Sequence, residues 1–214
     1  YRHYLGDGVE IFEGRSDELE AITPDFSISQ TDYSYGFTSR GCPNKCPWCV
    51  VPKIEGHQKI VDNWRTQIDT SKRLFLAFDN NFLACGSKHV ESVLSFCHEN
   101  NIKIDCNQGM DAQILHKNKN IQKVFVRYPK IWDRVRFAWD SERVNDSILF
   151  ALDFLYDNEI QGIPFLYMLY DNDASVEIWY ERMRILCQRG KNVDVFPMRF
   201  QNLENGMLIR GWGY

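Results

Sequence analysis

Short apolar runs alternate along the chain with longer stretches in which apolar residues recur every three or four positions. Runs rich in β-branched and aromatic residues are typical of strands, and we expect six of them, at residues 35–39, 74–78, 102–106, 135–139, 163–169 and 193–198. The longer stretches have the period of amphipathic helices. They predict five helices, at residues 57–69, 87–100, 111–128, 142–158 and 174–189.

Strands that alternate with helices of this length predict βαβ units and a parallel sheet. Six strands and five helices fit either an open doubly wound sheet or an incomplete barrel, and a complete eight-unit barrel needs about 250 residues. We therefore expect an α/β fold, a partial (β/α)6 TIM-like barrel of parallel strands, over residues 34–200. Residues 1–33 are expected to form an N-terminal cap or the remnant of an upstream domain, and residues 201–214 a C-terminal tail.

Composition narrows the class of protein. The formal net charge is −4 and no Lys/Arg run stands out, so charge does not support a nucleic-acid partner. No apolar run approaches the roughly 18 to 20 residues that span a bilayer, and the first residues carry no signal-like apolar segment. Seven cysteines, three of them within eight residues, favour a reducing compartment and a metal or cluster site over a disulfide framework. We expect a cytoplasmic protein without a membrane partner.

Three of these cysteines carry the candidate chemistry. Cys42, Cys46 and Cys49 have the spacing C-x3-C-x2-C and directly follow the first expected strand. Thiolates bind iron and zinc, and three of them can hold three irons of a cubane cluster while the fourth iron stays open. Electron-transfer clusters usually have four cysteine ligands, so this spacing favours a [4Fe–4S] cluster that performs chemistry at its open iron.

Two other interpretations of the cysteines stay open. A structural zinc ion takes four ligands, and His57 is the nearest candidate for the fourth, which would make the chain a non-catalytic metal-binding module. An electron-transfer protein would instead take its fourth cluster ligand from Cys85 or Cys106.

Residues 38–52, TSRGCPNKCPWCVVP, resemble the signature of the radical S-adenosylmethionine (SAM) superfamily. The closest similarity is to the branch that holds methylthiotransferases and cobalamin-binding radical SAM proteins, and Trp48 lies where the superfamily usually has an aromatic residue. The resemblance implies a [4Fe–4S] cluster on Cys42, Cys46 and Cys49, and reductive cleavage of SAM to a 5′-deoxyadenosyl radical. It also implies a transferase that moves a methyl or methylthio group to an unknown substrate, with an electron donor such as flavodoxin or ferredoxin.

The same resemblance makes the carboxyl ends of the strands candidate SAM contacts, since functional residues gather there in parallel α/β folds. Asp79, Asn80 and Asn81 follow the second strand and resemble an Asp-Asp-Asn-Phe-like string, which implies contact with the SAM amino group. An Asx turn that closes the loop is the structural alternative. Asn107 and Gln108 follow the third strand as polar candidates for SAM or substrate.

The fourth and sixth strands supply the remaining candidates. Asp140, with Ser141 second, is expected to contact the ribose, because one carboxylate can accept from both vicinal hydroxyls; a helix cap is the alternative. Met198 is expected to pack against adenine, and Arg199 to neutralise a SAM or substrate carboxylate.

Overall fold

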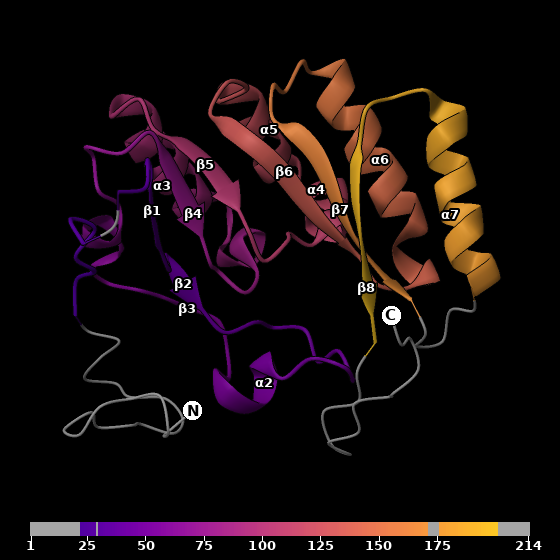
Figure 1. Cartoon of the computed structure of the whole chain (residues 1–214), viewed down its shortest axis with the longest axis horizontal. Helices are drawn as coiled ribbons and strands as arrows, with labels where there is room; N and C mark the ends of the chain where they lie inside the picture. Colours follow the sequence, from indigo (N-terminus) through magenta and orange to yellow (C-terminus); the bar gives the residue numbers. More distant parts are fainter. Residues whose placement is uncertain (1–21, 29, 171–175, 201–214) are drawn as a thin grey trace.

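The computed structural model describes residues 22–28, 30–170 and 176–200. Its centre is a six-stranded sheet in which every neighbouring pair of strands is parallel. The strands follow one another in the order β1 (Tyr33–Gly36), β4 (Leu74–Ala77), β5 (Lys103–Cys106), β6 (Trp132–Trp139), β7 (Ile163–Tyr170) and β8 (Asp194–Arg199). All six expected strands are present, so the parallel α/β fold is confirmed (Figure 1).

Five helices of the described chain lie in the connections from β4 to β8. They are α3 (Ser87–Glu99), α4 (Ala112–Lys117), α5 (Lys119–Arg127), α6 (Asn145–Asp157) and α7 (Val176–Arg189). Because the strand order never reverses and parallel crossovers are right-handed, the helices lie on one face of the sheet, as Figure 1 shows. This order is that of consecutive barrel units. In the described part of the chain the sheet is open between β1 and β8.

The core lies between the sheet and this helical layer. Alternate residues of the central strands, such as Val135, Phe137 and Trp139 on β6, are fully buried in it. Phe125 of α5 stacks on Trp132, with ring centroids 4.5 Å apart. Full burial of each such side chain contributes about 1.5–3 kcal/mol to the stability of the fold. This stabilisation fixes the register of the strands. The opposite face of the sheet, which carries the intervening residues, has no covering helix among the described elements.

The segment between the cysteines and β4 differs from expectation. The helix predicted at residues 57–69 is wrong: β3 (Lys59–Ile60) pairs antiparallel with β2 (Ser39–Arg40), and the 3₁₀ turn η2 (Trp64–Gln67) follows. Trp64 and Ile68 are both buried. Their spacing of four residues has the period of a helix, but a single short turn is enough to bury both side chains.

Two predicted helices are also divided. Asn118 separates α4 from α5, because its side chain accepts the N–H groups of Asn120 and Ile121 and so caps a new helix. The stretch at 142–158 begins as the 3₁₀ turn η4 (Glu142–Val144) before α6. The short helix α2 (Val51–Ile54) and the 3₁₀ turn η3 (Phe82–Cys85) were not expected.

The flanking segments are described only in part. Parts of three predicted segments lie outside the described residues: 1–21 and 29 of the cap, 201–214 of the tail, and 174–175 of the last helix. Within the cap, Phe26 is buried and packs edge-on against Tyr35, with ring centroids 5.3 Å apart. None of the helices in the described ranges has the length and apolar character needed to cross a membrane.

Candidate metal and cofactor site

The cysteine loop starts where β2 ends, and its first residues contact the backbone at its far end. Gly41 has φ +80°, and a side chain there would place Cβ 2.4 Å from the His57 carbonyl oxygen. The Cys42 N–H donates to the Gly56 carbonyl at 3.4 Å, and the Cys49 N–H donates to the Cys46 carbonyl at 3.0 Å. Only glycine fits this approach of two backbones, so the fold of the loop depends on the residue before its first thiol.

The three thiols are free and half-buried. Cys42, Cys46 and Cys49 form no disulfide. Burial, with a smaller contribution from the negative charges of Asp140, Cys49 and Cys42, raises the pKa of Cys46 to about 11. Thiolates that repel one another in a half-buried loop are stabilised by a shared cation. The donor set therefore fits an iron or zinc centre.

The four ligands that a single ion would need are not gathered around the cysteine loop as the structure describes it. Among the described residues, Asp79, Cys85 and His89 form a group of three ligand atoms within 4.8 Å of one another, and neither the cysteine loop nor His57 belongs to such a group. One zinc ion holds each thiolate at about 2.3 Å, which places tetrahedral sulfurs about 3.8 Å apart. A cubane binds each thiolate to a different iron and needs wider spacing. The cysteines and His57 are therefore not gathered around one point in the way that a single zinc ion would hold them.

Asn80 and Asn81, at the end of β4, both contact this loop. The Asn80 side-chain oxygen accepts the Gly41 N–H at 2.9 Å. The Asn81 side-chain nitrogen lies 3.6 Å from the Cys42 sulfur as a donor, while its side-chain oxygen is buried without a partner. Two of the three residues predicted after this strand are thus beside the thiols.

Asp79 has a different place. Its carboxylate is buried and accepts the Thr38 N–H at 2.8 Å, the Thr38 hydroxyl at 2.6 Å and the Ser39 hydroxyl at 2.6 Å. Burial raises the pKa of Asp79. These bonds fix the strand that leads into the cysteine loop, which is a supporting role; a SAM contact by Asp79 stays a prediction.

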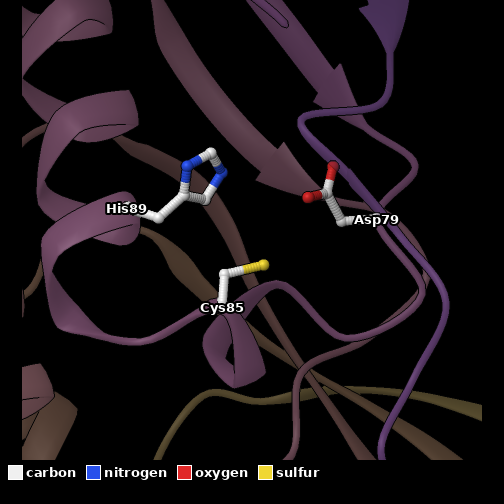
Figure 2. Close-up of side chains that lie close together, drawn as sticks. All are labelled: Asp79, Cys85 and His89. Atoms are coloured by element: carbon white, nitrogen blue, oxygen red, sulfur yellow. The ribbon is translucent and has the colours of Figure 1, made fainter. Parts of the chain in front are cut away.

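Figure 2 shows Asp79 together with Cys85 and His89. The Thr38 hydroxyl, which donates to Asp79, also lies 3.0 Å from Nε2 of His89. Burial raises the pKa of Cys85 to about 11 and lowers the pKa of His89. Gln58 donates to the Cys85 sulfur at 2.9 Å. The ligand atoms of this group already have partners, so we interpret it as a hydrogen-bonded support.

Asp140, directly after β6, also contacts the cysteine loop. The Trp48 side chain hydrogen-bonds to it. Burial raises the pKa of Asp140 to about 6, against the lowering effect of Arg182. Ser141 follows at the start of η4 and makes no side-chain cap bond there. The structure therefore places two predicted residues, Trp48 and Asp140, in direct contact beside the thiols.

A buried ion pair on the face of the sheet without helices was missed by sequence reasoning. Arg136 of β6 donates twice to Asp105 of β5, at 2.5 and 2.6 Å, and to the Tyr167 hydroxyl at 3.1 Å. Tyr167 donates in turn to the Asn107 carbonyl at 2.7 Å. Gln108 is exposed at the adjoining turn. An aspartate flanked by the apolar residues Ile104 and Cys106 of β5 was the signal that could have indicated this network.

Met198 and Arg199 lie at the carboxyl end of the edge strand β8, opposite Leu169 and Tyr170 of β7. Met198 is 43% exposed. This end of β8 is on the same edge of the sheet as the loops that follow β4, β5 and β6, because all these strands are parallel. The adenine and carboxylate contacts expected of these two residues stay predictions.

Comparison of the chain with models of known protein families gives no match, and comparison with curated proteins gives none either.

Proposed function

We propose that this chain is a radical SAM enzyme that holds a [4Fe–4S] cluster on Cys42, Cys46 and Cys49. The observation that supports it most is the set of three free, half-buried cysteines on one loop beside the carboxyl edge of a parallel sheet. Residues 38–52 also resemble the superfamily signature. These observations together favour a cluster with one iron left for SAM.

When bound, the cluster and SAM supply reductive cleavage of the sulfonium and a 5′-deoxyadenosyl radical that abstracts a hydrogen atom. The chain's own residues hold and orient these groups. Asp140, positioned by the Trp48 side chain, accepts hydrogen bonds from the ribose hydroxyls. Asn80 keeps the loop backbone in place through Gly41.

We extend the proposal to the barrel, the reaction, the cellular compartment and the electron donor. The open sheet acts as a partial (β/α)6 barrel whose uncovered face, with Arg136 and Tyr167, receives the substrate. The reaction is transfer of a methyl or methylthio group, in the cytoplasm, with electrons from a protein such as flavodoxin or ferredoxin.

SAM cleavage tests this function directly. The protein is reconstituted with iron and sulfide under nitrogen, mixed with SAM and dithionite, and assayed for 5′-deoxyadenosine by chromatography. We expect product from the native chain, none from Cys46→Ala, and native amounts from Cys187→Ala, a control at an exposed cysteine on α7. An inactive native chain, or an active Cys46→Ala variant, contradicts the proposal; a colourless protein with one zinc ion favours the metal-binding module.

A further inference from the structure

Asn81 holds its side chain against a cluster ligand from a fixed backbone. The residue is 3% exposed, precedes the 3₁₀ turn η3, and its backbone carbonyl accepts from Gln58 at 3.1 Å. The next residue, Phe82, is fully buried. The amide therefore has little freedom to turn away from Cys42, whose sulfur lies 3.6 Å from Nδ2.

The orientation of this amide follows from the chemistry of the sulfur. A thiolate accepts hydrogen bonds and donates none, so the nitrogen of Asn81 must face it. The opposite orientation would place the lone pairs of the side-chain oxygen against a negative sulfur. Asn80 provides a contrast, because its amide bonds the loop backbone at Gly41 and not a sulfur.

We propose that Asn81 is a positioning residue that donates an N–H···S hydrogen bond to the Cys42 thiolate and thereby raises the reduction potential of the cluster. This inference depends on the cluster of the proposed function. On reduction the cluster takes one electron from an external reductant, no bond breaks, and the sulfurs become more negative. A donor at a sulfur stabilises that reduced state more than the oxidised one, as hydrogen bonds to cluster sulfurs do in general.

The contact predicts a measurable change in potential. Replacing Asn81 with leucine keeps a similar volume and removes the donor. We expect a roughly tenfold smaller equilibrium constant for one-electron reduction, which corresponds to a midpoint potential lower by about 59 mV. Asn81→Ser, whose hydroxyl is too short to reach the sulfur, is expected to give a shift of the same sign.

Redox titration of the reconstituted protein, followed by low-temperature electron paramagnetic resonance (EPR), tests this. Asn44→Leu is the matched control, because it removes an exposed amide of the same loop that bonds Asp111 at 2.9 Å and no sulfur. Its potential should equal the native value. Native potentials in both Asn81 variants overturn the inference, and so does loss of iron loading in both, which would make Asn81 necessary for holding the loop. If the native chain itself binds no cluster, the proposed function fails instead.

Discussion

Replacing Gly41 with alanine is expected to destabilise the cysteine loop strongly. A left-handed backbone costs a residue with a side chain about 1–2 kcal/mol, and Gly41 has φ +80°. The new Cβ would also lie 2.4 Å from the His57 carbonyl oxygen, 2.7 Å from its carbon and 2.9 Å from the Gly56 oxygen. These are backbone atoms, and relieving such overpacking costs about a further 1–3 kcal/mol. We expect the free energy of unfolding to fall by about 2–5 kcal/mol.

Gly56→Ala separates the two contributions. Gly56 lies in the same loop with φ +71°, but a Cβ there meets nothing within 4 Å. This variant should therefore lose only the backbone contribution of about 1–2 kcal/mol. Urea unfolding followed by circular dichroism gives both values, and iron content after reconstitution should fall in Gly41→Ala alone. Equal losses in the two variants would refute the argument that the close approach to His57 shapes the loop.

Three further predictions concern buried carboxylates. Because the folded pKa of Asp140 is raised from 3.8 to about 6, the folded state binds the proton more tightly, and the free energy of unfolding should fall by about 3 kcal/mol as pH rises from about 3 to about 7. Urea unfolding across this range should show that fall in the native chain and not in Asp140→Asn; equal slopes would contradict it. Asp79→Ala leaves the Thr38 donors unpaired and should lower the free energy of unfolding by about 2–4 kcal/mol. Urea unfolding measures this loss, and an unchanged value would count against the supporting role of Asp79. Arg136→Met leaves Asp105 buried without its partner and should cost about 3–5 kcal/mol; adding Asp105→Leu should recover much of this loss, and no recovery would argue against the pair.

The sheet was predictable from sequence because its signal is local. Each of the six strands is a short apolar run, and the buried alternate positions of β6 follow from that pattern. The helix predicted at 57–69 failed because Trp64 and Ile68 have helical spacing but are buried by a 3₁₀ turn. Periodicity gives the positions that are buried, and the tertiary setting decides which backbone buries them.

The site was predictable only in part for the same reason. The spacing of the cysteines identified the loop, and the parallel strand order explains why Asn81 and Asp140 meet it from two strand ends. The supporting role of Asp79 depends on hydroxyls 40 and 41 residues earlier in the chain. The pair of Arg136 with Asp105 joins neighbouring strands that are separated by a helical connection. Such contacts have no local signature.

The open iron of a three-cysteine cubane is tested most directly by the effect of SAM on the reduced protein. Iron and sulfide analysis should give about four of each per chain, and the EPR signal of the dithionite-reduced cluster should change when SAM is added. An unchanged signal in a fully loaded protein, or one zinc ion in place of iron, would contradict the assignment of Cys42, Cys46 and Cys49 as ligands of a SAM-binding cluster.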